Sequence, residues 1–435
     1  MLIFAVSFCN YEPTPVEKRD VLIIAYYFPP MGLSGVQRTL KFVKYLPEYG
    51  WRPIVLTTGD IPFYAYDETL LKELEDKDIK IYRTPAKNNK KNNKARNFPS
   101  RTVQKLGSML LQTIYQPDSK VKWKGPALKL ADQIIKENDI QAVFATAPPF
   151  TDFLIAEEIR KKYNLPYVID YRDAWIDNEF HFYATPFHKL YSIGLERQVL
   201  SKASKAFVIT RNTKEKIISR YRMLSHEDVM ILPHGYDKDD FVKHKSVEPD
   251  PKKFVITHSG VFQDSRTPKY FLEAVAKLIK TNKEAREKIQ LRFIGVMRKN
   301  HIKLIKKYGL KNNTILTGYL NHSDAVRNLK ESDLLWLMQF DNVRSPGKLY
   351  EYFGARKPIL ACLPEGEMRN LAMESKAAIA ADPRNVTEIK NALNSCFKLW
   401  KLKNLPRPSE DFVEKYDRQK LTGILSRELG LTAEY

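Results

Sequence analysis

Cysteines and long apolar segments are scarce in this sequence. Its 435 residues contain three cysteines, Cys9, Cys362 and Cys396, whose odd number and wide spacing fit neither a disulfide framework nor a metal-binding motif. A reducing compartment is therefore expected, with the cytoplasm as the default. No stretch reaches the roughly 18 uncharged apolar residues of a membrane-spanning helix, so we expect a soluble or peripheral protein.

Acidic residues are also in short supply relative to basic ones. Fifty-one Asp and Glu residues stand against 72 Lys and Arg, which gives a formal net charge of +21. Such an excess indicates a polyanionic partner. The candidates are nucleic acid, a phosphorylated substrate and an anionic membrane. The sequence lacks an RNP, helix-turn-helix or zinc-finger signature, which disfavours the nucleic-acid interpretation.

Strand-like and helix-like patterns alternate through most of the chain. Strands are predicted where short runs are rich in apolar and β-branched residues: Val21–Phe28, Pro53–Thr57, Ala142–Ala145, Tyr167–Asp170, Ala206–Thr210, Phe254–His258, Leu291–Ile294, a run near Ile315, Leu334–Met338 and Ile359–Leu363. Helical stretches separate these runs. The alternation predicts α/β architecture, with parallel sheets covered on both faces.

The patterns divide the chain into two domains. Residues 20–240 form the first predicted domain, and the polar, proline-containing residues 242–253 are interpreted as a linker. Residues 254–405 repeat the alternation, so we predict two Rossmann-like domains facing one another across a cleft. A helix within residues 410–435 is expected to pack back on the first domain. Its apolar residues are Val413, Tyr416, Ile424 and Leu425.

A basic insertion interrupts the first domain at about residues 60–126. Between Lys87 and Lys124 there are ten basic residues and one acidic residue, Asp118. An apolar stripe with helical spacing lies inside it, at Val103, Leu106, Leu110 and Ile114. Two interpretations are equally weighted: a basic amphipathic lid, which could contact an anionic membrane, or a solvated insertion.

The stretch NVRSPGKLYEYFGARKP, residues 342–358, carries the strongest site signal. It predicts a loop followed by a helix with Ser345 as N-cap, Pro346 at the first position and Gly347 next. Lys348 falls in the first turn, where a cation suits a bound anion, and Glu351 lies three residues on, on the same solvent-facing side. Ammonium on phosphate and carboxylate on ribose hydroxyls would fit a nucleoside diphosphate. The alternative is a surface Lys–Glu pair.

Two further loops in the first half follow predicted strands. The loop PPMGLSG contains Gly32 and Gly35, which permit close backbone approach to an anion or a sugar, although it is not a GxGxxG motif. The segment DYRDAW places Arg172, Asp173 and Trp175 at the carboxyl end of a strand, where ligands of open parallel sheets gather. The alternative for Arg172 and Asp173 is a structural pair that closes a loop.

In this order and spacing, the motifs resemble those of GT-B glycosyltransferases, in particular the retaining family 4 group. The motifs are YYFPPMGLSGVQR, TAPPF, VIDYRDAW, PHGYDKDDF, HSGVFQDSRTP, FIGV and SPGKLYEYFGARKPILA, and the likeness runs from about Asp20 to the last helix. The resemblance implies transfer of a sugar from a nucleotide-diphosphate sugar to a glycan or lipid-linked acceptor, in cell-surface polysaccharide synthesis and with retention of configuration.

The resemblance also implies roles for individual residues. Glu351 matches the second carboxylate of the family's Glu-x7-Glu pair, which meets the nucleotide ribose, whereas the first falls on Val343. Lys348 and Arg266 match diphosphate ligands, and Lys269 is a weaker third. Arg172 and Asp173 stand where the family has its His-Asp pair. Val261 stands where the family's basic pair has its arginine.

We predict no metal and no other cofactor, since preorganised cations can stabilise a diphosphate leaving group. The Asp-x-Asp triplet Asp237–Asp239 lies near the linker, where helix capping is the favoured interpretation. Two alternatives to the transferase stay open: a nucleotide-sugar 2-epimerase of the same fold, and a non-catalytic protein that binds nucleotides or nucleic acid.

Overall fold

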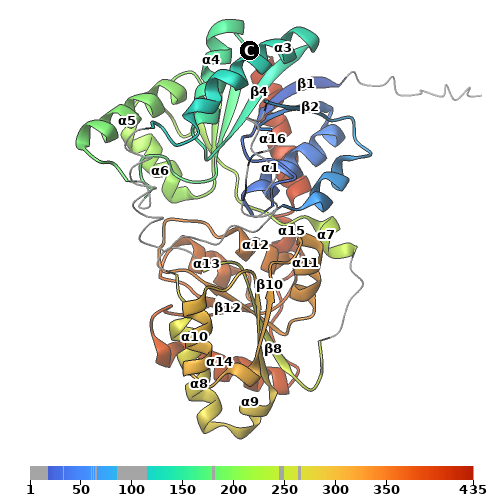
Figure 1. The fold of residues 1–435 in the computed structure, drawn as a ribbon, viewed down its shortest axis with the longest axis vertical. Coiled ribbons are helices and arrows are strands. Elements are labelled where there is room, and N and C mark those ends of the chain that lie inside the picture. The colour runs from blue at the N-terminus through green and yellow to red at the C-terminus, as the bar shows by residue number, and fades with distance from the viewer. Residues whose placement is uncertain are drawn as a thin grey trace, which may run out of the picture.

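The computed structural model describes residues 18–32, 34–59, 61, 63, 66–85, 115–178, 182–243, 249–262 and 266–434. It consists of two α/β domains stacked along the long axis of the molecule (Figure 1). The predicted fold class is confirmed. The predicted membrane-contacting stripe from Val103 to Ile114 lies outside the described residues, as do Cys9 and the rest of residues 1–17.

Domain 1 is built on a parallel seven-stranded sheet with the order β3-β2-β1-β4-β5-β6-β7. Its strands are β1 (Arg19–Ile24), β2 (Trp51–Thr57), β3 (Lys80–Arg83), β4 (Ile140–Ala147), β5 (Tyr167–Tyr171), β6 (Lys205–Val208) and β7 (Val229–Ile231). Its helices are α1 (Ser34–Tyr45), η1 (Leu46–Tyr49), η2 (Glu68–Leu74), η3 (Val121–Trp123), α3 (Lys124–Glu137), α4 (Thr151–Tyr163), α5 (Pro186–Leu200), α6 (Arg211–Arg220) and α7 (Lys238–Val242). Apolar clusters lie on both faces of the sheet, as a buried parallel sheet requires.

Domain 2 contains a parallel six-stranded sheet with the order β10-β9-β8-β11-β12-β13. Its strands are β8 (Phe254–Ser259), β9 (Ile289–Ile294), β10 (Thr314–Gly318), β11 (Leu334–Met338), β12 (Ile359–Cys362) and β13 (Ala378–Ala381). Its helices are α8 (Lys269–Thr281), α9 (Lys283–Lys288), α10 (Lys299–Lys307), η4 (Lys311–Asn313), α11 (His322–Lys330), α12 (Gly347–Gly354), α13 (Glu367–Glu374) and α14 (Val386–Lys401). The carboxyl ends of the strands of both sheets lie toward the junction of the domains.

The end of the chain joins the two domains. The predicted single helix is instead two helices, α15 (Glu410–Glu414) and α16 (Arg418–Ala433), because Asp417 breaks the helix and caps α16 by accepting from Gln419 N–H. Val413 packs in the core of domain 2, whereas Leu425 packs in the core of domain 1. The expected return to the first domain is therefore confirmed, although Ile424 is exposed.

Helix α1 carries cations that are buried against carboxylates from distant parts of the chain. The Lys41 ammonium lies 2.6 Å from Glu73, 2.5 Å from Asp237 and 2.9 Å from Asp240. Asp240 also lies 2.8 Å from the Nε2 atom of His322 in domain 2. Asp237 caps α7 by accepting from the Asp239 N–H, which confirms the capping interpretation of the Asp-x-Asp triplet. This cluster ties α1, the interdomain segment and domain 2 together.

Within the described ranges, no helix combines the length and the apolar character that crossing a bilayer requires.

Candidate active site

The loop between β11 and α12 leaves the carboxyl edge of the second sheet. Pro346 occupies the N-cap position of α12, and no side chain caps the helix. The prediction of Ser345 as N-cap is wrong, because the extended backbone of Pro346 (ψ 109°) starts the helix one residue later. The Ser345 hydroxyl lies 3.4 Å from that of Tyr350. A Cβ placed on Gly347 would meet no described atom within 4 Å, so the uncapped first turn opens onto space that suits an anion.

Lys348 and Glu351 form an ion pair on α12, with the ammonium 2.8 Å from the carboxylate. The Lys348 side chain is partly exposed, whereas Glu351 is buried, so the expectation that both face solvent is wrong for Glu351. Burial raises the pKa of Glu351, but Lys348, with smaller contributions from His322 and Arg418, outweighs it and holds the pKa below its ordinary value. Glu351 is therefore a buried anion that positions the partly exposed Lys348 ammonium.

His258 lies near the end of β8, the strand next to β11, and was not predicted as a site residue. Its ring stacks on Phe262, with 4.6 Å between centroids, and its Nδ1 lies 3.0 Å from the carbonyl oxygen of Trp336. Because a carbonyl only accepts, Nδ1 carries the proton and Nε2 keeps a lone pair. Burial, with Arg266 and Lys348, lowers the pKa of His258 to about 4, so the ring is neutral at physiological pH.

The sheet topology places the predicted diphosphate ligands at one edge. Arg266 follows β8 and Lys348 follows β11, and because these strands are parallel neighbours, both residues come after carboxyl ends of the second sheet. Lys269 begins α8, and its ammonium lies 5.4 Å from the centroid of the Tyr270 ring. The backbone is tightly packed nearby: a Cβ on Gly295 would lie 2.5 Å from the Gly260 carbonyl oxygen, at a φ of +121°. Only glycine fits there.

Arg172 holds three loops of domain 1 together. Its guanidinium donates to the carbonyl oxygens of Gly35 and Pro148, and its Nε lies 3.4 Å from that of Ala147. Gly35 therefore lies against Arg172, and Gly32 is buried in the same loop. These contacts favour the structural interpretation of Arg172, which positions the loops around it. Trp175 is buried and stacks on Phe150, so it belongs to the core.

Asp173 faces domain 2. A small hollow between the domains is lined by Arg172, Asp173 and Thr210 on one side and by Val343, Arg344 and Ser345 on the other. Burial raises the pKa of Asp173, and the charges of Arg172 and Arg344 offset only part of that rise. The structure thus brings Asp173, from domain 1, next to the loop that leads into Lys348.

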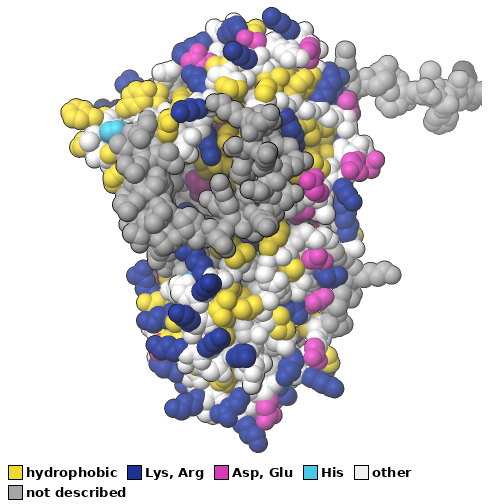
Figure 2. All heavy atoms as spheres, viewed as in Figure 1, with side chains coloured by type: hydrophobic (Ala, Val, Ile, Leu, Met, Phe, Trp, Pro, Cys, Tyr) yellow, Lys and Arg dark blue, Asp and Glu magenta, His cyan; other side chains and the backbone are white. Residues whose placement is uncertain are grey.

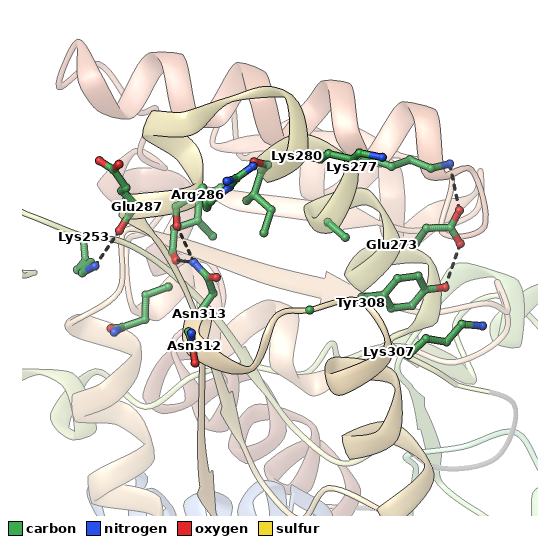
Figure 3. A pocket seen from close by; sticks show the side chains of 15 residues that line it. Lys253, Glu273, Lys277, Lys280, Arg286, Glu287, Lys307, Tyr308, Asn312 and Asn313 are labelled. Carbon is green, nitrogen blue, oxygen red and sulfur yellow. Dashed lines mark hydrogen bonds and ion pairs between the residues drawn. The ribbon is translucent and has the colours of Figure 1, made fainter.

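A second, broader hollow lies in domain 2, at the opposite edge of its sheet (Figure 3). Lys253, Lys280, Arg286 and Lys307 line it, near the amino ends of β8 and β9. Lys277 pairs there with Glu273 at 3.0 Å. Because ligands of parallel sheets bind at the carboxyl ends of strands, this hollow is not the site that Lys348 and Glu351 form.

One family model matches the second half of the chain. Residues 239–408 match the family described as glycosyl transferases group 1. No curated protein sequence matches the chain significantly.

Solved structures match nearly the whole chain at low sequence identity. Anabaena HepE in complex with UDP and glucose is 13% identical, with a TM-score of 0.64 over 95% of this chain and 99% of that chain. Sucrose-phosphate synthase from Thermosynechococcus elongatus is 11% identical, with a TM-score of 0.63 over 95% and 100%. WaaG, a glycosyltransferase involved in lipopolysaccharide biosynthesis, is 14% identical, with a TM-score of 0.59 over 94% and 99%. At identities this low, the structural matches show that the two-domain fold is shared, and nothing more.

Proposed function

From the premise that the chain has the GT-B fold and that its residues 239–408 belong to the glycosyl transferases group 1 family, we propose that it transfers a sugar from a nucleotide-diphosphate sugar to an acceptor. The observation that carries the proposal is the Lys348–Glu351 pair at the uncapped start of α12, with Arg266 after the neighbouring strand β8. In this proposal, Lys348, Arg266 and the N-terminus of α12 would together bind the diphosphate. HepE, which shares the fold, binds UDP in its solved structure.

The proposed mechanism assigns the leaving group to domain 2. Breaking the sugar–phosphate bond leaves negative charge on the diphosphate, and Lys348, Arg266 and the N–H groups near Ser345 and Gly347 would stabilise that charge as it develops. Lys269 is the weaker third cation. Glu351 would accept hydrogen bonds from the ribose hydroxyls, and the lone pair of His258 Nε2 could accept one from the sugar.

Domain 1 would supply the acceptor side. Asp173 lies across the hollow from the α12 loop, and Arg172 and the loop that contains Gly32 and Gly35 shape the surface around it. We propose retention of the anomeric configuration and a glycan or lipid-linked acceptor in cell-surface polysaccharide synthesis, which the likeness to WaaG supports. The basic residues 87–124 would contact an anionic membrane from the cytoplasmic side.

Nucleotide sugars should stabilise the protein against unfolding. A ligand present at about 100 times its dissociation constant adds about 2.7 kcal/mol, which is readily seen as a rise in Tm. A panel of nucleotide-diphosphate sugars is compared by thermal melting of the wild type and of Lys348→Ala. The proposal expects at least one ligand to raise the Tm of the wild type and to lose most of that effect in the variant. A panel without any stabilising ligand would contradict it.

Activity should be insensitive to chelators, because Lys348, Arg266 and the helix N-terminus take the place that a divalent cation fills in metal-dependent transferases. Transfer rates are measured before and after treatment with EDTA, and after addition of Mg²⁺ or Mn²⁺. We expect less than about a twofold change at each step, since no preorganised charge is removed. Loss of activity with EDTA and its return with Mn²⁺ would show that carboxylates near the junction hold a metal.

A further inference from the structure

The basic hollow of domain 2 is the cavity that Lys253, Lys280, Arg286 and Lys307 line, and the proposed function makes no use of it. It has a volume of about 1050 Å³ and lies at the amino ends of β8, β9 and β10, at the end of the domain where Figure 1 places α9. Pockets for small molecules occupy about 300–1000 Å³. The hollow therefore has room for a small-molecule ligand, away from domain 1.

Three helix ends meet at the basic hollow. Lys280, Arg286 and Lys307 lie in the last turns of α8, α9 and α10, and Figure 2 shows Lys and Arg side chains gathered over the lower half of the molecule, where Figure 1 places these helices. A cation in the last turn interacts favourably with the carboxyl end of its own helix, which accounts for each residue separately. Folding then brings the three charges to one cavity. Their mutual repulsion costs stability, and a bound anion would relieve it.

Main-chain carbonyl groups hold two of the cations in position. The Nε atom of Arg286 donates to the carbonyl oxygen of Ile279, at 3.1 Å. The Lys253 ammonium donates to the carbonyl oxygen of Glu287, at 2.8 Å. A guanidinium has five N–H donors and an ammonium has three, so both groups keep further donors for a ligand. Because a carbonyl group has no net charge, these contacts orient the cations without neutralising them.

The carboxylates of the basic hollow neutralise little of its charge. Glu273 pairs with Lys277 at 3.0 Å, and the Tyr308 hydroxyl donates to the same carboxylate at 3.1 Å. Figure 3 shows these three side chains at one side of the hollow, with Lys253 and Arg286 at the other. In the part of the chain that the structure describes, no carboxylate forms an ion pair with any of the other four cations that line the hollow. Four positive charges are thus available to one ligand.

A ligand with several negative charges close together fits this arrangement. A terminal phosphate carries about −1.5 to −2 charges at pH 7, so a di- or triphosphate group with a free end matches several cations within a small volume. The diphosphate of a nucleotide sugar is esterified at both ends and carries less charge. Arginine binds phosphate oxygens through two parallel N–H groups, and lysine binds them as a point charge. Duplex nucleic acid would instead require basic residues along an extended surface.

We propose that the basic hollow binds a di- or triphosphate group with a free end, supplied either by inorganic polyphosphate or by a nucleotide. The four cations without a carboxylate partner would contact the phosphate oxygens, whereas Lys277 stays paired with Glu273. This site goes beyond the proposed function and does not depend on it, because Lys348 follows a carboxyl end of the sheet and the hollow lies at the amino ends.

The test is isothermal titration calorimetry of the full chain with tripolyphosphate and with ATP, in buffer without divalent cations. Every protein carries Lys348→Ala, which weakens binding at the donor site. Lys280→Gln/Lys307→Gln is compared with Lys398→Gln/Lys403→Gln, which removes two exposed lysines of domain 2 that do not line the hollow. We expect the hollow variant to bind both ligands at least about tenfold more weakly, and the control to change by less than about twofold. Melting temperatures confirm that all variants are folded.

The two ligands distinguish the source of the phosphate. Tighter binding of ATP than of tripolyphosphate identifies a nucleotide site, and the reverse identifies a site for free polyphosphate. Absence of binding by the Lys348→Ala protein, or equal binding by the hollow variant and the control, would overturn the proposal. An oligonucleotide without a terminal phosphate that binds more tightly than tripolyphosphate, and only to proteins with an intact hollow, would overturn it in favour of nucleic acid.

The outcome is separable from that of the proposed function. If nucleotide sugars stabilise the wild type but neither polyphosphate nor ATP binds the hollow, the proposed function survives and this site fails. If polyphosphate or ATP binds the hollow and no nucleotide sugar stabilises the protein, the reverse holds.

Discussion

Lys348→Ala and Glu351→Ala should each lower kcat/KM by about 100-fold while leaving the protein folded, because each removes one preorganised contact to the donor. The Lys348 ammonium is held 2.8 Å from Glu351 and is partly exposed, so it can meet a diphosphate without reorganisation. Lys348→Ala should raise KM and also lower kcat, since the ammonium contacts the diphosphate of the bound donor and the charge on the leaving group grows further in the transition state. Steady-state kinetics with a nucleotide sugar identified by thermal melting measure both constants.

A matched pair in the same domain provides the control. Lys277 and Glu273 form a helical ion pair at 3.0 Å in the basic hollow, away from the carboxyl ends of the strands. Lys277→Ala should change kcat/KM by less than about twofold, because an exposed pair contributes little even to stability. Near-wild-type turnover in both α12 variants, with Tm values unchanged, would remove this helix from the site.

The central strands of both sheets were predictable, whereas several edge strands were not. Buried parallel strands such as Leu334–Met338 are continuous apolar runs, which are visible in the sequence. The strands β3, β7 and β13 contain three or four residues each and lie at the edges of their sheets. With so few residues, no periodicity forms, and pairing with a neighbour decides their structure.

The candidate site could be predicted where its residues are close together in the sequence. Lys348 and Glu351 are three residues apart on a helix that follows a strand, and this spacing alone predicts an ion pair on one face. The role of Arg172 could not be predicted, because it depends on carbonyl groups of two distant segments, Ala147–Pro148 and Gly35, the latter at a sequence separation of 137 residues. His258 reads as an ordinary strand residue, because its contacts with Phe262 and with the carbonyl oxygen of Trp336 arise only on folding.

The same limit applies to Lys41, for which we expect the largest effect on stability. Helix α1 reads as a helix with surface lysines, yet Lys41 is 1% exposed and contacts Asp240 across 199 residues of sequence. Lys41→Met should lower the free energy of unfolding by about 3–5 kcal/mol at pH 7, because it takes from buried Asp237 and Asp240 a cation that Lys44 and His322 replace only in part. The exposed pair Lys77–Glu48, at 3.1 Å, gives a control, and Lys77→Met should cost less than about 1 kcal/mol.

The dependence of this loss on pH and on calcium distinguishes lost charge from lost packing. Burial raises the pKa of Asp240, but Lys41, with His322, lowers it well below its ordinary value. The wild type therefore keeps this stabilisation above about pH 4 and loses it as the pH falls further. In Lys41→Met the carboxylates should bind protons more readily, so the deficit in the free energy of unfolding should shrink between pH 7 and pH 5.

Glu73, Asp237 and Asp240 offer oxygens within 4.8 Å of one another, so Ca²⁺ should restore part of the stability of the variant and should not raise that of the wild type. Urea unfolding at several pH values, with and without Ca²⁺, measures both effects, and a deficit that neither acid nor Ca²⁺ reduces would mean that Lys41 acts through packing rather than charge.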